Sequence, residues 1–132
     1  MADKGKVLVL DDEEIVCERV ADNLTRKGLS VETFTDSQQA IDRLAGQQFD
    51  VVVTDLKMKG PSGLDVVHFV RQNQSACEMI IITGYASMDA AREAEYSGVY
   101  QFVTKPFRME DLSKLVLKAA RRARSRKGKV AP

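Results

Sequence analysis

The 132-residue sequence contains no tryptophan, one histidine and only two cysteines, Cys17 and Cys77. The two cysteines do not form a CxxC motif, so neither a disulfide framework nor a zinc site is expected, and we interpret both as inert thiols of a reducing compartment. No apolar run approaches the roughly 18 residues that a membrane-spanning helix needs. The apolar stretch near the N-terminus is too short for a signal peptide. The sequence therefore predicts a cytoplasmic protein without membrane contact.

An excess of charge of one sign is also missing, because 20 Lys and Arg residues nearly balance 19 Asp and Glu residues. Global charge thus does not point to nucleic acid, a membrane surface or an acidic substrate. The exception is a basic run from Arg121 to Lys129, which lacks interleaved aromatics. We interpret it as a cationic helix end, favoured by the helix dipole, that continues into a solvated tail. Contact with nucleic acid or acidic partners and the stub of a linker to a further domain are the alternatives.

The length fits one domain, which we place at residues 1–121, with 122–132 as a basic C-terminal tail or linker stub. Five short runs rich in Val, Ile and Phe predict strands at Lys6–Leu10, Ser30–Phe34, Asp50–Thr54, Met79–Thr83 and Tyr100–Val103. The first, third and fourth runs are almost continuously apolar, which is typical of strands covered by helices on both faces. The second run alternates apolar and polar residues, so we expect an edge strand.

Helical patterns alternate with these strands. The first, third and fifth helical patterns cover Glu13–Lys27, Leu64–Asn73 and Met109–Arg124. The second is capped by Thr35 or Asp36 and ends at Gly46, and the fourth runs from Ser87 to about Tyr96. This alternation predicts an α/β fold, a single doubly wound five-stranded parallel sheet with five helices on its two faces. Such sheets bind ligands at the carboxyl ends of their strands.

Polar side chains stand at the ends of four of the five predicted strands. Asp11 and Asp12 follow the first strand, Asp55 follows the third, Thr83 ends the fourth, and Lys105 follows the fifth and precedes Pro106. Right-handed crossovers bring all strand ends to one edge of the sheet, so these side chains are expected to converge.

The chemistry of this set indicates phosphoryl transfer. Two carboxylates about 4 Å apart repel by roughly 4 kcal/mol at an effective dielectric constant of about 20, so three of them favour a bound cation. Mg²⁺ accepts carboxylate oxygens together with a phosphate. Lys105 and the Thr83 hydroxyl suit phosphoryl oxygens, and an aspartate is a competent nucleophile that needs no separate base. The single histidine, His68, is interpreted as a helix-face residue without a role.

Over residues 5–121 the set Asp11-Asp12, Asp55, Thr83-Gly84 and Lys105-Pro106-Phe107 resembles the receiver domains of two-component response regulators. The resemblance implies a flavodoxin-like strand order 2-1-3-4-5, with Asp55 as the phosphoacceptor. It implies that Asp11, Asp12, Asp55 and the backbone carbonyl of Lys57 hold Mg²⁺. It further implies that Lys105 and Thr83 bind the phosphoryl group, and that the bond between Lys105 and Pro106 is cis.

The resemblance also implies how such a domain would work. A sensor histidine kinase or phosphotransfer protein would phosphorylate Asp55, Thr83 would move inward, and Phe102 would rotate into the space left behind. The surface of helix 4, strand 5 and helix 5 would then change and regulate an output domain, a downstream protein or a phosphorylation-linked homodimer. The domain would promote its own phosphoryl transfer and dephosphorylation without being a turnover enzyme, and it would not itself contact nucleic acid.

One departure from the family pattern lies after Asp55, where Lys59 replaces the usual proline and Pro61 follows. We therefore expect an unusual loop shape with unchanged phosphorylation chemistry. The sequence disfavours two other functions. A haloacid-dehalogenase-type phosphohydrolase is disfavoured because its Asp-x-Asp motif and room for a cap domain are missing. A binding module without phosphorylation is disfavoured because no acidic or lysine residue of the set is missing.

Overall fold

The protein is described here by a computed structural model that covers residues 4–56, 63–74, 76–84 and 98–130, with side chains described up to Arg126. The strands are β1 (Lys6–Leu10), β2 (Ser30–Phe34), β3 (Val51–Asp55), β4 (Glu78–Thr83) and β5 (Gln101–Thr104). The described helices are α1 (Glu14–Arg26), α2 (Ser37–Gly46), α3 (Gly63–Asn73) and α5 (Met109–Val130). The helix predicted from Ser87 to Tyr96 lies outside the described residues.

The five strands form one parallel sheet in the order β2-β1-β3-β4-β5. This confirms the doubly wound α/β fold and the strand order that the resemblance implied. It also confirms that β2 is an edge strand. Its alternating sequence matches its burial, since none of its five residues is fully buried, whereas every residue of β3 and β4 is buried.

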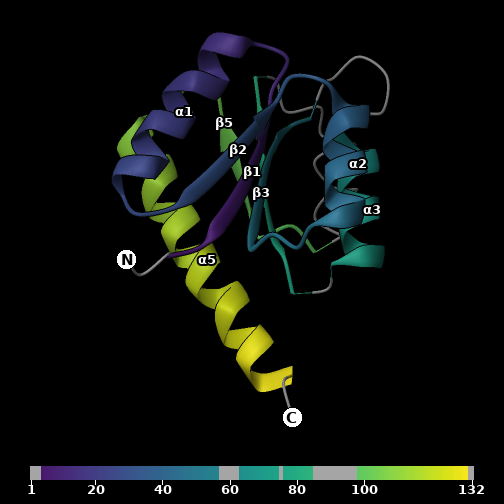
Figure 1. The fold of residues 1–132 in the computed structure, drawn as a ribbon. Coiled ribbons are helices and arrows are strands. Elements are labelled where there is room, and N and C mark those ends of the chain that lie inside the picture. The colour runs from purple at the N-terminus through teal and green to yellow at the C-terminus, as the bar shows by residue number, and fades with distance from the viewer. Residues whose placement is uncertain (1–3, 57–62, 75, 85–97, 131–132) are drawn as a thin grey trace.

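Helices cover both faces of the sheet (Figure 1). Helices α1 and α5 lie on one face and α2 and α3 on the other. Each face has its own apolar core. Val9, Val53 and Ile82 belong to the cluster beneath α1 and α5, and Leu8 and Val52 to the cluster beneath α2 and α3. Adjacent strand residues thus point to opposite cores, which explains why the central strands are apolar throughout.

Two predicted boundaries were wrong in ways that bear on function. Strand β3 is shifted by one residue, so Asp55 is its last residue and does not follow it. Helix α5 continues to Val130 and does not end at Arg124. Figure 1 shows its last turns projecting beyond the sheet. The basic run is therefore largely helical, and a separate tail from residue 122 is not distinguished by secondary structure.

Local signals explain several boundaries. The Asp36 carboxylate caps α2 by accepting a hydrogen bond from the Gln39 backbone N–H at 2.8 Å. Gly28 follows α1 with a φ of +95°, a conformation that favours glycine. Cys17 and Cys77 are buried and not joined in a disulfide. Within the described residues, no helix is both long and apolar enough to cross a membrane.

Candidate functional site

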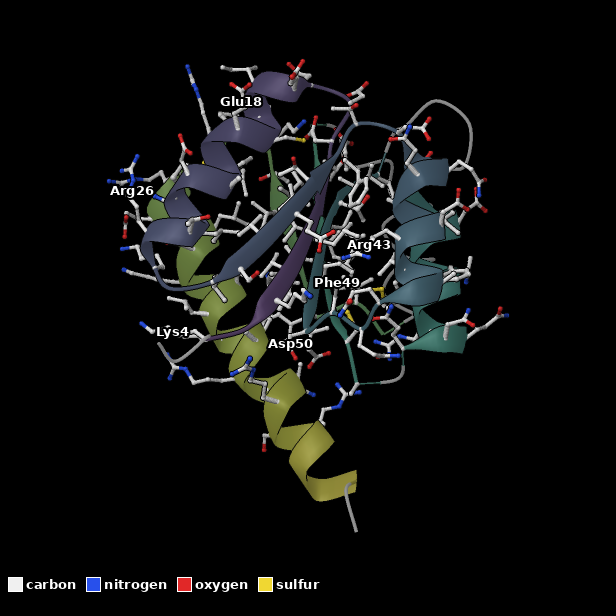
Figure 2. The ribbon with its side chains drawn as sticks, in the orientation of Figure 1. Lys4, Glu18, Arg26, Arg43, Phe49 and Asp50 are labelled. Atoms are coloured by element: carbon white, nitrogen blue, oxygen red, sulfur yellow. The ribbon has the colours of Figure 1, made fainter. Side chains whose placement is uncertain are left out.

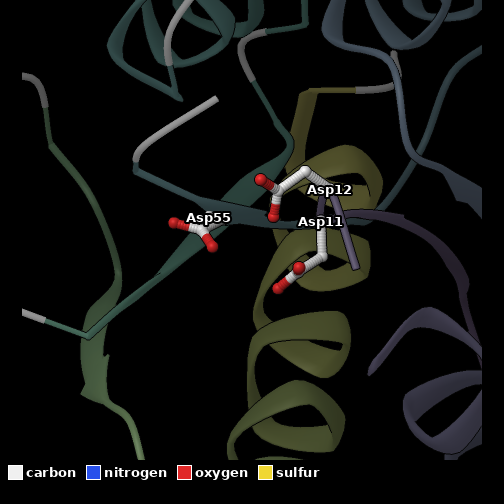
Figure 3. A group of neighbouring side chains, drawn as sticks. All are labelled: Asp11, Asp12 and Asp55. Carbon is white, nitrogen blue, oxygen red and sulfur yellow. The ribbon is translucent and has the colours of Figure 1, made fainter. Parts of the chain in front are cut away.

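Three carboxylates from two neighbouring strands meet at the carboxyl edge of the sheet (Figure 3). One carboxylate oxygen from each of Asp11, Asp12 and Asp55 lies within 4.8 Å of the others. Asp11 and Asp12 directly follow β1, and Asp55 ends β3, the strand paired with β1. Asp11 and Asp55 are buried, with 2% and 8% of their surface exposed, whereas Asp12 is exposed. The predicted convergence of the three acids is present.

A lysine ammonium group contacts two of these acids. The Lys105 Nζ lies 3.1 Å from Asp11 Oδ2 and 3.0 Å from Asp55 Oδ2. Its backbone N–H donates to the Thr83 carbonyl at 2.8 Å, which fixes the chain where β5 ends. The following bond to Pro106 is cis, as the resemblance implied. Lysine is thus placed where it can contact an anion that approaches Asp55.

The protonation of these groups reflects burial and mutual contact. Burial raises the pKa of Asp11, and hydrogen bonds from the Glu13 backbone N–H and from Lys105 only partly offset this effect. Burial acts to lower the pKa of Lys105, but its hydrogen bonds to Asp55 and Asp11 outweigh burial and raise that pKa. Lys105 therefore stays charged near neutral pH, while a buried Asp11 carboxylate carries an energetic cost.

The residue after Asp55, Leu56, is held by backbone hydrogen bonds to two neighbouring elements. The Leu56 N–H donates to the Ile82 carbonyl of β4 at 3.1 Å, and the Leu56 carbonyl accepts from the Gly63 N–H of α3 at 3.1 Å. Gly63 begins α3 so close to this segment that an added Cβ would lie 2.3 Å from the Asp55 carbonyl oxygen. Only glycine permits this approach.

The donor set fits a hard divalent cation. All three side chains offer carboxylate oxygens, the ligands that Mg²⁺ and Ca²⁺ prefer, and no thiolate or imidazole is part of the group. Three carboxylates carry more negative charge than the Lys105 ammonium can neutralise. A bound cation would relieve both the repulsion and the cost of the buried Asp11 carboxylate.

Thr83, Phe102 and His68 lie on the elements that the sequence predicted for them. Thr83 is buried at the end of β4, one residue beyond Ile82, the register partner of Asp55. Phe102 lies on β5 and packs, partly buried, against the core beneath α2 and α3. Lys57, the proposed carbonyl ligand, lies outside the described residues, as do Lys59 and Pro61. His68 is exposed on α3, on a different element from the three acids.

One residue of the site was missed by sequence reasoning. Glu13 contributes its backbone N–H to Asp11 Oδ1 at 2.9 Å, and its carboxylate lies 3.8 Å from Lys105. Glu13 is also the N-cap residue of α1, although its side chain makes no capping hydrogen bond. The position of Glu13, an acidic residue directly after Asp11 and Asp12, was the sequence feature that could have indicated its place in the site.

Comparison with known proteins identifies a family. The model of the response regulator receiver domain matches residues 7–117. The response regulator PilR of Pseudomonas aeruginosa is 33% identical over 118 residues, which cover 89% of this chain and 26% of PilR. The transcriptional regulatory protein FixJ of Bradyrhizobium diazoefficiens is 32% identical over 123 residues, covering 93% of this chain and 60% of FixJ. The chain thus spans less than two thirds of either relative.

Solved structures of receiver domains have the same fold as this chain. The signal receiver domain of a putative LuxO repressor from Vibrio parahaemolyticus superposes with a TM-score of 0.89, covering 97% of this chain and 98% of that one, at 22% identity. Full-length FixJ from B. japonicum superposes with a TM-score of 0.83 at 31% identity, covering 92% of this chain and 60% of that one. The sequence match and the fold together show that this chain belongs to the receiver domains of the response regulators of two-component signalling.

Proposed function

We propose that this domain is a signalling switch that accepts a phosphoryl group on Asp55 from a histidine kinase or phosphotransfer protein. One observation supports this above all. The Asp55 carboxylate lies in contact with the Lys105 ammonium at 3.0 Å and within 4.8 Å of two further aspartates. A nucleophile, a cation for phosphoryl oxygens and oxygen ligands for a metal thus occupy one edge of the sheet.

In the proposed reaction, an Asp55 carboxylate oxygen attacks the phosphorus of the donor's phosphohistidine. The new P–O bond forms as the P–N bond breaks, and the electron pair stays on the imidazole nitrogen, which takes a proton from water. An aspartate attacks as a carboxylate, which has no proton to lose, so the proposed reaction requires no general base. The work left to the protein is alignment and charge neutralisation.

Lys105 and the acidic residues divide the task of neutralisation. The Lys105 ammonium would shift from Asp55 to a phosphoryl oxygen once the carboxylate has become an acyl phosphate, since the phosphoryl oxygens then carry the negative charge. Asp11, Asp12, Asp55 and the carbonyl of Lys57 would hold Mg²⁺. When bound, the ion supplies positive charge to the phosphoryl oxygens. The Thr83 hydroxyl is proposed to donate to another of these oxygens.

The proposed switch couples this site to a surface of the domain. Thr83 and Phe102 lie on the adjacent strands β4 and β5, so an inward movement of Thr83 would change the packing space of the partly buried Phe102. Because phenylalanine lacks a hydroxyl, its two positions would differ in packing alone. The phosphoryl group must bind one arrangement better than the other for any shift to follow.

The partners proposed from this mechanism are a phosphodonor, an output domain or downstream protein, and a second copy of the phosphorylated domain. We propose the cytoplasm as its location, because two buried cysteines that form no disulfide fit a reducing compartment. Two activities are not proposed for this domain: sustained turnover of phosphomonoesters, and direct contact with nucleic acid.

The decisive experiment is incubation with acetyl phosphate and Mg²⁺, followed by intact mass measurement. One added phosphoryl group is expected, stable in acid and labile in base. The adduct should be absent from Asp55→Asn and absent when EDTA replaces Mg²⁺. Asp22→Asn, an exposed position on α1, is the matched control and should be phosphorylated like the wild type. An unmodified wild-type protein would refute the proposal, and sustained hydrolysis of a phosphomonoester would favour a phosphohydrolase.

A further inference from the structure

The last turns of α5 lie against two buried acids at the amino-terminal edge of the sheet, opposite the site described above. Asp50 directly precedes β3 and Glu78 begins β4, and only 4% and 2% of their surfaces are exposed. Figure 1 shows α5 passing this edge before it projects beyond the sheet. The match to the receiver family ends at residue 117, so the contacts lie beyond the matched region of the helix.

Three arginines of α5 make ion pairs with these two acids. Glu78 is bracketed by Arg122, whose Nε lies 2.8 Å from Oε2, and by Arg126, whose Nη1 lies 2.9 Å from Oε1. Asp50 Oδ2 lies 3.5 Å from Arg124 Nε. The same Asp50 oxygen accepts a hydrogen bond from the Lys6 backbone N–H at 2.8 Å.

Helix geometry explains why both acids are reached at once. Successive residues of a helix are rotated by about 100°, and Ala123 of α5 is fully buried, so its side of the helix faces the domain. Arg122 and Arg126 therefore lie on one side of the buried face of α5, and Arg124 lies on the other side. Asp50 precedes β3, and Glu78 begins the neighbouring strand β4. Glu78 therefore pairs with arginines on one side of the helix, and Asp50 pairs with the arginine on the other side. Figure 2 shows Asp50 at this end of the sheet, beside α5.

Each half of this arrangement is unfavourable alone. A buried carboxylate without a partner charge is strongly disfavoured. A helix end that carries Arg121, Arg122, Arg124 and Arg126 suffers repulsion between like charges, including the pair at positions 122 and 126. The helix dipole favours cations at this end of α5, but the repulsion within so dense a cluster of arginines weakens a helix end that has no partner charges. Pairing the arginines with Asp50 and Glu78 removes both penalties together.

We propose that Asp50 and Glu78 form a clamp that keeps the α5 extension, residues 121–130, helical and fixed to the sheet. The basic run thereby serves as an intramolecular docking element and not as a nucleic-acid-binding arm, because three of its arginines are engaged within the domain. The clamp sets the direction in which α5 leaves the domain. A partner or further segment that engages this helix end meets it in one orientation relative to β3 and β4, which end at Asp55 and Thr83.

Amide hydrogen exchange measured by NMR on the whole chain tests this proposal without any phosphodonor. In the wild type, amides of residues 121–126 should be protected like those of the preceding turn of α5. Arg126→Gln and Glu78→Gln should each speed their exchange by about tenfold or more. Arg126 lies at the surface, so its replacement should leave the fold intact even if Glu78→Gln destabilises β4.

The matched control is Arg121→Gln, which removes a charge from the same exposed helix end. No ion pair involving Arg121 is found in the part of the chain that the structure describes. In the Arg121→Gln variant, the amides of residues 121–126 should exchange as in the wild type, or slightly more slowly because repulsion between the arginines is reduced. Equal exchange in Arg126→Gln and Arg121→Gln would overturn the proposal, as would wild-type amides that exchange at the rate of an unstructured peptide.

Discussion

At the residue scale, the most informative side chain of the acidic site is Asp12, because it is exposed and belongs to the group of three carboxylates. Asp11 and Asp55 contact Lys105, so replacing either would remove an ion pair as well as a repulsion. Replacing Asp12 chiefly removes the repulsion. Its effect on stability therefore isolates the energetic cost of assembling the site.

We expect Asp12→Asn to raise the free energy of unfolding in EDTA by up to about 1 kcal/mol, the Coulomb energy of one exposed pair at this separation in water. Urea unfolding at neutral pH measures this directly. Asp22→Asn, the exposed control on α1, should have little effect. An Asp12→Asn variant no more stable than that control would show that the carboxylates do not repel measurably.

At the element scale, the position of Asp55 depends on how closely α3 approaches the end of β3. An added Cβ on Gly63 would meet two backbone atoms, the Asp55 oxygen at 2.3 Å and the Leu56 Cα at 2.8 Å. Neither atom belongs to a flexible side chain, so the helix or the strand end must move. The geometry of Asp55 and the stability of the domain are thus linked through one glycine.

Gly63→Ala should lower the free energy of unfolding by about 1–3 kcal/mol, the usual cost of overpacking, and should slow phosphorylation of Asp55 by acetyl phosphate. Gly46→Ala is the control, since its Cβ would meet nothing within 4 Å at the end of α2. That variant should be as stable as the wild type or slightly more stable. If Gly63→Ala and Gly46→Ala have the same free energy of unfolding, the close approach of α3 to the end of β3 does not require a glycine at position 63.

A second element-scale contact joins β2 to α2 and gives a pH signature. Arg43 binds Glu32 through two hydrogen bonds, of 2.7 Å and 2.9 Å, and this contact lowers the pKa of Glu32 below its ordinary value of 4.5. A lowered carboxylate pKa stabilises the fold above the unfolded pKa, and this contribution is lost as pH falls through the folded pKa.

Glu32→Gln should therefore be less stable than the wild type at pH 7, by roughly 0.2–1 kcal/mol for a surface pair. The difference should shrink as pH falls below 4.5. Urea unfolding at several pH values measures it, and Glu18→Gln, an exposed position on α1 (Figure 2), is the control. A deficit that persists unchanged in acid would assign the effect to packing and not to charge.

At the scale of the whole molecule, the sequence predicted what depends on local pattern. Continuous apolar runs identified the buried strands, and the polar residues at their ends located Asp55 and its neighbours. The contacts of the basic run were not predictable in this way. Glu78 and Arg126 are far apart in the sequence, and no local pattern around either residue indicates that the two side chains form an ion pair. The arginines alone indicated a solvated helix end, and the predicted helix was consequently too short.

The acidic site also links metal binding to the stability of the entire fold. Its carboxylates come from β1 and β3 and meet only when the sheet is formed, so a cation bound there favours the folded state over the unfolded chain. Mg²⁺ at 100 times its dissociation constant should raise the free energy of unfolding by about 2.7 kcal/mol.

Thermal and urea unfolding with increasing MgCl₂ measure this effect, with NaCl of matched ionic strength as the control for screening. The same titration of Asp12→Asn should show a weaker response, because one of the three proposed carboxylate ligands is lost. Both outcomes depend on the sheet as a whole, since the unfolded chain separates Asp12 from Asp55 by more than 40 residues. A wild-type protein that Mg²⁺ and matched NaCl stabilise equally would contradict a specific metal site at this edge.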